Sequence, residues 1–356
     1  MTKKNSKSKW TRDLRGWLEK LEDEGELQKI GARVECGGEI QEIGKQMSAR
    51  KGPAVLFENI DGYDDSWCKK LFVGSLNTWS KVALTVGLPG NSKSNEITAK
   101  IQKTLKAAID PITVKSGPVK DNIIRGEDID INKIPVPHWH PQDSGRYINT
   151  WAAIVTRDPD TGEYNIGAYR GVILNKNQIS VFLLLTQGWG MHYHKYIQRN
   201  EPMPVACIYG WDPSLMLTAG SPVTTMNEYQ WMGSIRGEPV PLIKCETVDL
   251  EVPASAEIVI EGTISTDSST FQPEAPLKEV SGLYDEERLM PVIDVSCVTH
   301  RDDPIMVGSA IGLAPIIEEQ VITMTAGVKA ILRHALELQG VPGGQLLGPL
   351  YSTCLS

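Results

Sequence analysis

The pattern of hydrophobic and polar residues changes character near residue 148 of this 356-residue chain. Before that point, apolar residues recur at helical spacing over residues 11–25, which predicts an amphipathic helix. Thr11 is its expected N-cap, and Gly25 is the expected stop signal. The other elements expected in this part are strands at 54–60 and 71–76 and a helix at 95–109.

From residue 148 onward, apolar and polar residues alternate and turn sequences interrupt the apolar runs, which predicts consecutive antiparallel hairpins. The strands expected here are 148–157, 164–174, 178–185, 205–210, 242–252, 256–264 and 291–300. Helices are expected near 190–200 and 226–236, and a longer one over 316–339.

These elements predict an α+β fold in four parts. The expected parts are a small α/β N-terminal domain (1–116), a proline-rich connecting segment (117–147), a central antiparallel split β-barrel (148–312) and a C-terminal helical segment (313–356).

Composition narrows the class of protein. Hydrophobic residues make up 41% of the chain and charged residues 22%, as in ordinary soluble globular proteins. The net charge of −8 argues against a nucleic-acid surface, and no apolar run approaches the roughly 20 residues of a membrane span. Six cysteines without a CxxC pair indicate neither a disulfide framework nor a zinc site, so a reducing cytoplasm is the expected location.

One polar constellation stands out from the β-rich region. Arg170 lies in an apolar run, where a guanidinium is costly to bury unless carboxylates meet it, and Glu274 and Glu279 follow in a loop that contains two prolines. If both carboxylates reach Arg170, one should stay ionised while the other holds a proton near neutral pH and acts as a general acid. A solvated loop is the alternative interpretation.

Asn165 and Glu228 add a possible oxygen-rich site for Mg²⁺ or Mn²⁺. Glu228 is also close enough to a helix start to serve only as a dipole partner. In an undistorted strand Asn165 and Arg170 would face opposite sides, although a bulge at Gly167 would change that. His192 and His194 are too close in sequence to share one helix face, so either could be at most a single ligand or phosphate contact.

An ordered series of motifs resembles the UbiD family of prenylated-flavin-dependent decarboxylases. The motifs are IPVPHWHPQDSGRYI, NIGAYR, ACIYGWDPSLMLTAGSP, NEYQWMG, LIKCETVDLEVPASAEIVIEGTI, PEAPLKEVSGLY and VTHRDDPIM, and the resemblance spans roughly residues 10–340. It implies that the barrel is of the flavin-reductase-like type and that 313–356 is a truncated form of the family's C-terminal α/β domain.

The resemblance also implies a site. Arg170, Glu274 and Glu279 would be the catalytic set, and Asn165 and Glu228 would bind Mn²⁺ (or Mg²⁺) that bridges to the phosphate of prenylated FMN, often with K⁺ nearby. The family's third metal ligand is typically a histidine, and here either Gln187 or His192 would replace it unless water does. The segments expected to line the cofactor are Ile166, Gly167, Ala168, Tyr169 and Arg170, and Ala219, Gly220, Ser221 and Pro222.

The implied activity is reversible, non-oxidative decarboxylation of an aromatic or α,β-unsaturated carboxylic acid through a covalent adduct with prenylated FMN. A flavin prenyltransferase would supply the cofactor, CO₂ would be released or fixed, and the chain would act as a homo-oligomer or a subunit of a carboxylase complex. The main alternative is a non-catalytic or structural subunit of such a complex. A weaker one is a flavin-binding oxidoreductase, which would leave both glutamates without a role.

Overall fold

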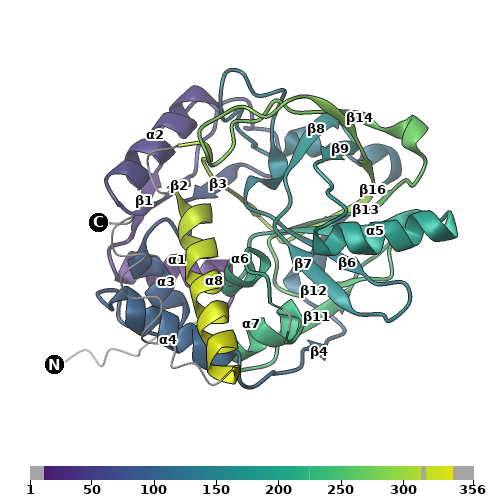
Figure 1. The fold of residues 1–356 in the computed structure, drawn as a ribbon. Helices are drawn as coiled ribbons and strands as arrows, with labels where there is room; N and C mark the ends of the chain where they lie inside the picture. Colours follow the sequence, from purple (N-terminus) through teal and green to yellow (C-terminus); the bar gives the residue numbers. More distant parts are fainter. Residues whose placement is uncertain (1–11, 224, 314–317, 340–356) are drawn as a thin grey trace.

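The computed structural model of the protein describes residues 12–223, 225–313 and 318–339, and it shows an α+β fold with two principal sheets (Figure 1). A small mixed sheet lies on the N-terminal side, and a larger antiparallel sheet forms the middle of the molecule. Within the described residues, no helix is both long enough and apolar enough to cross a bilayer.

The small sheet has the order β1-β2-β3-β17. Its strands are β1 (Leu27–Ile30), β2 (Ala54–Phe57), β3 (Lys70–Val73) and β17 (Ile305–Gly308). The predicted strands at 54–60 and 71–76 are therefore confirmed but shorter. β17 comes from the far end of the sequence and pairs in parallel with β3, so distant parts of the chain complete one sheet. The four-part division of the chain stays a prediction.

Four helices belong to the N-terminal part: α1 (Leu14–Asp23), α2 (Gly38–Ala49), α3 (Trp79–Thr85) and α4 (Ser94–Thr104). The N-cap predicted for the first helix is wrong. Thr11 lies outside the described residues, and α1 begins at Leu14 because the Asp13 carboxylate accepts a hydrogen bond from the Gly16 N–H at 2.9 Å. Helices α2 and α3 were not predicted. The few apolar residues of α2 and the short length of α3 weaken the periodic signal.

The large sheet contains eight strands, all paired antiparallel. Their order is β7-β6-β10-β13-β16-β9-β8, and β5 also pairs with β16. The strands are β5 (Asn122–Arg125), β6 (Ala153–Arg157), β7 (Tyr164–Gly167), β8 (Gly171–Asn175), β9 (Gln178–Val181), β10 (Met203–Tyr209), β13 (Ile258–Ile264) and β16 (Val292–His300). The predicted antiparallel middle is confirmed, and its description as a split barrel stays a prediction.

The single strand predicted over 164–174 is wrong. The run divides into β7 and β8, which lie at opposite ends of the sheet order. Between them the backbone leaves the ladder, because the Ala168 N–H donates to the Ala219 carbonyl at 3.2 Å. The Tyr169 ring folds back over Gly167, where a Cβ atom would lie only 2.3 Å from the ring. Asn165 and Arg170 therefore belong to different ends of the sheet.

The strand predicted over 242–252 is also wrong. It is a hairpin of β11 (Pro241–Lys244) and β12 (Glu251–Pro253), to which β4 (Ile112–Thr113) adds in parallel. The reason is a fully buried carboxylate: Glu261 accepts hydrogen bonds from the N–H groups of Glu246 and Thr247, which takes both groups out of any ladder.

The remaining helices are α5 (Gly188–Arg199), α6 (Ser214–Ala219), α7 (Glu228–Arg236) and α8 (Glu319–Leu338), and a short hairpin joins β14 (Gln272–Glu274) to β15 (Arg288–Met290). The helices predicted at 95–109, 190–200, 226–236 and 316–339 are thus confirmed within the described residues. The yellow helix α8 runs between the N-terminal helices and α6 (Figure 1), and it packs on α4 and α6.

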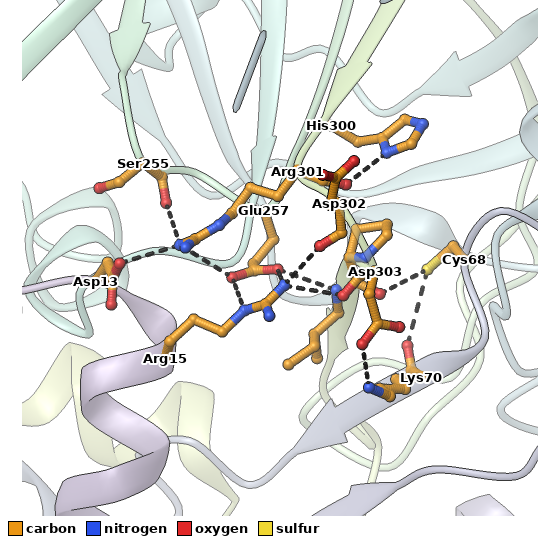
Figure 2. A network of polar contacts seen from close by, with 12 residues as sticks. Asp13, Arg15, Cys68, Lys70, Ser255, Glu257, His300, Arg301, Asp302 and Asp303 are labelled. Atoms are coloured by element: carbon orange, nitrogen blue, oxygen red, sulfur yellow. Dashed lines mark hydrogen bonds and ion pairs between the residues drawn. The ribbon is translucent and has the colours of Figure 1, made fainter. Parts of the chain in front are cut away.

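A buried carboxylate joins the N-terminal helix to the large sheet (Figure 2). Glu257 is fully buried, accepts two hydrogen bonds from Arg15 at 2.9 and 2.8 Å, and lies 3.4 Å from Arg301. It also accepts the Ile305 N–H at the start of β17, and Arg301 reaches Asp13 at 3.0 Å. One side chain thereby fixes α1, β17 and the end of β16 together.

We expect Glu257→Ala to lower the free energy of unfolding by about 3 kcal/mol, because it leaves two guanidinium groups and a backbone N–H without their shared acceptor. Urea denaturation measures the change. The matched control is Asp303→Asn, which removes an ion pair with Lys70 whose aspartate side chain is 61% exposed, and it should cost less than about 1 kcal/mol. Equal losses for the two variants would contradict the assigned role of Glu257.

Candidate active site

Three acidic side chains surround the Arg170 guanidinium. Glu274 binds it in a bidentate pair, with Nε–Oε1 at 2.9 Å and Nη2–Oε2 at 2.8 Å. Glu279 binds Nη1, and Asp285 accepts a bond from Nη2 at 2.8 Å. The sequence expectation that Glu274 and Glu279 meet Arg170 therefore agrees with the geometry, and Asp285 is an addition that the sequence reasoning missed.

The acidic groups differ sharply in exposure. The Glu274 side chain is 0% exposed, Asp285 is 22% exposed and Glu279 is 38% exposed, around an arginine side chain that is itself 10% exposed. Buried ion pairs need further hydrogen bonds to offset desolvation, and the Tyr147 hydroxyl supplies one to Glu274 Oε1 at 3.1 Å. Glu279 is the member of the cluster with the best access to solvent.

The chain around β14 and β15 positions the three carboxylates. Glu274 ends β14, and Glu279 and Asp285 lie in the loop that leads to β15. The loop is held by its own backbone, because Glu279 N–H donates to the Leu283 carbonyl at 2.9 Å and Asp285 N–H to the Leu277 carbonyl at 3.1 Å. The Arg170 guanidinium carbon also lies over the Phe182 ring, 4.1 Å from the ring centroid.

The electrostatics keep Arg170 and Asp285 charged. Burial acts to lower the pKa of Arg170, but hydrogen bonds and charges from Glu274, Asp285 and Glu279 outweigh it, so the pKa lies above its ordinary value. Burial acts to raise the pKa of Asp285, and the bonds from Arg170 and the Glu286 N–H outweigh it, so this pKa lies below its ordinary value. Arg170 and Asp285 therefore form a permanently ionised pair near neutral pH.

A cleft of about 590 Å³ adjoins this cluster through the segment that precedes Arg170. Helix α8 contributes Gln320, Met324 and Val328 to its lining, together with the end of β7 and the loop after α6. The residues predicted to line a cofactor fall here: Ile166, Gly167, Ala168, Tyr169, Ala219, Gly220, Ser221 and Pro222 all line the cleft. Arg170 does not, because its side chain turns toward the acidic cluster.

An oxygen-rich group lies on the wall of the cleft, formed by Asn165, Gln187 and Glu228. Glu228 accepts the Ile166 N–H at 3.2 Å, and among the residues that the structure describes no cationic side chain forms an ion pair with it. Burial raises the pKa of Glu228 to about 7, although two backbone hydrogen bonds act against the shift. A partly buried carboxylate in this setting suits a bound cation.

Asn165 is held close to the start of α5. Its Nδ2 donates to the Tyr169 hydroxyl at 3.2 Å, and its Oδ1 would lie 1.8 Å from a Cβ atom at Gly188. The Tyr169 ring stacks on Trp189 with the centroids 4.2 Å apart. Glycine at 188 is therefore required for the asparagine to sit beside the helix N-terminus.

Of the two residues proposed as a third ligand, only Gln187 lines the cleft. His192 is buried, and its Nδ1 forms a 2.9 Å hydrogen bond with the Thr156 hydroxyl, while His194 is exposed beside Gln198. No cluster of three or more His, Cys, Asp or Glu residues occurs in the described part of the chain. A metal site here would therefore depend on the amide oxygens of Asn165 and Gln187.

Sequence reasoning missed Tyr147, Phe182 and Asp285, each of which contacts Arg170 or Glu274. Tyr147 lies in the segment 117–147, for which the sequence predicts only a connecting role. Asp285 begins the charged sequence DEER, and such charged sequences are usually solvated. Phe182 is the one aromatic residue in the predicted strand 178–185, and no other feature of the sequence sets it apart.

We compared the chain with models of known protein families, and two of them match it. A family model described as the 3-octaprenyl-4-hydroxybenzoate carboxy-lyase Rift-related domain matches residues 112–314, and the model for the N-terminal domain of the same carboxy-lyase matches residues 18–101. This chain belongs to the UbiD family. The family resemblance of its motifs is thereby confirmed.

Solved structures of UbiD-class enzymes share the fold. An evolved dimeric form of HmfF from Pelotomaculum thermopropionicum, in complex with prFMN, is 28% identical with a TM-score of 0.82 over 92% of this chain and 73% of that chain. Vanillic acid decarboxylase of Sedimentibacter hydroxybenzoicus, ShVdcCD in closed form, is 29% identical with a TM-score of 0.87 over 93% and 70%. The 3,4-dihydroxybenzoic acid decarboxylase AroY of Klebsiella pneumoniae, at 23% identity and a TM-score of 0.82 over 93% and 70%, supports the fold alone.

If a divalent cation such as Mn²⁺ binds beside Asn165, Gly188→Ala should displace Asn165 and lower the affinity for Mn²⁺ by about tenfold or more, because the new methyl group would overlap Asn165 Oδ1. Titration with Mn²⁺ followed by electron paramagnetic resonance measures this. Gly38→Ala is the matched control, since Gly38 also begins a helix and has no atom within 4 Å of its Cβ position. Equal Mn²⁺ affinities in the two variants would contradict the placement of a cation beside Asn165.

Proposed function

We propose that the protein catalyses the reversible, non-oxidative decarboxylation of an aromatic or α,β-unsaturated carboxylic acid, with prenylated FMN and Mn²⁺ bound in the cleft. The observation that carries the proposal is the largely buried Arg170 side chain, paired with Glu274 and Glu279 beside a cleft large enough for a flavin. Family membership and relatives described as decarboxylases support it.

Loss of CO₂ leaves an electron pair on the substrate carbon that amino-acid side chains do not delocalise, and prenylated FMN supplies the electron sink when bound. The backbone of Ile166–Tyr169 and the loop Ala219–Pro222 would hold it, because both line the cleft and are tied together by the bond from Ala168 to Ala219. A relative with prFMN bound supports this choice of cofactor.

The oxygen donors on the cleft wall fit a hard divalent cation. Glu228 offers a carboxylate, and Asn165 and Gln187 offer amide oxygens, which suit Mn²⁺ or Mg²⁺ better than zinc or copper. Such an ion would neutralise Glu228 and bind the cofactor phosphate, and a K⁺ ion would fit the same chemistry. Gln187 is the third protein ligand that we favour over His192, because Gln187 lines the cleft and His192 does not.

Arg170, Glu274 and Glu279 each have a distinct part in the proposed reaction. Arg170 orients the substrate carboxylate, and the fully buried Glu274 keeps the guanidinium fixed through its bidentate pair. Glu279 delivers the proton that replaces CO₂, since its 38% exposed side chain can recover a proton from solvent after each turnover. In the direction of carboxylation, Glu279 accepts that proton.

We expect Glu279→Gln to reduce CO₂ release at least about a hundredfold while the flavin stays bound, because the amide cannot donate the proton in the reaction. Protein reconstituted with prenylated FMN is assayed for CO₂ release from vanillic acid and 3,4-dihydroxybenzoic acid. Glu287→Gln, an exposed glutamate nearby in the same loop, is the control and should keep full activity. Undiminished turnover in the Glu279 variant would remove its assignment as proton donor.

Co-expression with a flavin prenyltransferase should yield protein that carries prenylated FMN, identified by its mass and absorption spectrum. Removal of Mn²⁺ with a chelator should release the flavin, because the cation would link Glu228 and Asn165 to the phosphate. Protein that binds no prenylated flavin, even with Mn²⁺ present, would instead support a non-catalytic subunit of a carboxylase complex. Assembly as a homo-oligomer or in such a complex stays a prediction.

A further inference from the structure

Asp285 and Glu279 bind different nitrogens of the Arg170 guanidinium. Its Oδ2 accepts from Nη2 at 2.8 Å, whereas Glu279 binds Nη1. The contacts formed with the described residues take up four of the five guanidinium N–H bonds: Nε–H and one Nη2–H by Glu274, the other Nη2–H by Asp285, and one Nη1–H by Glu279. Nη1 is therefore the part of the guanidinium with spare capacity.

The second carboxylate oxygen of Asp285 also accepts hydrogen bonds. Its Oδ1 accepts from Arg288 Nη2 at 2.8 Å and from the Glu286 N–H at 2.9 Å. Arg288 stands opposite Glu274 in the pairing of β14 with β15, so the second arginine is fixed by the same hairpin that carries the first carboxylate. The carboxylate of Asp285 thus connects two guanidinium groups, one buried and one exposed.

Both guanidinium groups also lie over one aromatic ring. The guanidinium carbons of Arg170 and Arg288 are 4.1 and 5.2 Å from the centroid of Phe182. Two like charges sharing a ring repel each other, and Asp285 bonds to both of them. Without that negative charge, the repulsion would act on Arg170 directly, and only Glu274 and Glu279 would resist it.

We propose that Asp285 is a positioning residue for Arg170. It holds the Nη2 side of the guanidinium against Arg288 and Phe182, so that Glu279 is the only exchangeable partner and the Nη1 edge is the one offered to a substrate carboxylate. The catalytic consequence rests on the function proposed above, whereas the positioning itself does not. Glu279 can then leave Nη1 when it takes up or delivers a proton, while Arg170 stays in place.

The first test needs no substrate. Crystal structures of Asp285→Asn and of the control Glu287→Gln should differ at Arg170: the guanidinium turns toward Glu279 or occupies two orientations in the first and keeps one orientation in the second. Arg288→Gln should give a smaller change, because it removes the repelling charge together with the support for Asp285. An Arg170 guanidinium within about 0.5 Å of its wild-type position in Asp285→Asn would overturn the proposal.

The second test separates positioning from proton transfer. With vanillic acid and 3,4-dihydroxybenzoic acid as probes, Asp285→Asn in protein reconstituted with prenylated FMN should raise KM about tenfold with a smaller loss in kcat, since Glu279 is untouched. Asp285→Glu, which keeps the charge, should recover most of the loss. A merely structural role in the loop would displace Glu279 too and lower kcat at unchanged KM, and that result would overturn the proposal.

The two tests distinguish failure of the inference from failure of the proposed function. Wild-type protein that binds no prenylated flavin and decarboxylates neither probe would count against the function, and the crystal structures would still decide whether Asp285 positions Arg170. Full activity and unchanged KM in Asp285→Asn, with an active wild type, would count against Asp285 alone.

Discussion

The site depends on one buried guanidinium and the carboxylate that compensates it. Moving Arg170 out of water is costly, and its bidentate pair with the fully buried Glu274 offsets that cost only because Tyr147 satisfies a further lone pair of the carboxylate. The charge of Arg170 is therefore permanent and its direction is fixed. Glu279 and Asp285 then share what remains of its hydrogen-bonding capacity.

The fold places the two chemical environments that the proposed reaction would use at the two ends of one short segment. The break between β7 and β8 turns Asn165 toward the cleft and Arg170 toward the acidic cluster, although only four residues lie between them. Tyr169 spans this break, stacked on Trp189 and bonded to Asn165. A cation site and an acid–base site can thus sit at the two ends of one short segment.

Long-range connections hold this arrangement. Strand β17 completes the N-terminal sheet, Glu257 ties α1 to the large sheet (Figure 2), and α8 closes one wall of the cleft with Gln320 bonded to the Thr150 carbonyl. Each link joins residues more than a hundred positions apart. The cleft is therefore a product of the whole chain, and no single segment contains it.

The sequence by itself determined the family, the antiparallel middle, the long helices and the expectation that Glu274 and Glu279 meet Arg170, because period and motif order are local properties of the chain. It did not determine the break in 164–174, the hairpin in 241–253 or the third carboxylate at Asp285. Those depend on the Ala219 carbonyl, on the buried Glu261 and on Arg170, which bind their partners only once separate segments are packed together. Tertiary structure decided them because burial, not local propensity, sets which hydrogen bonds must form.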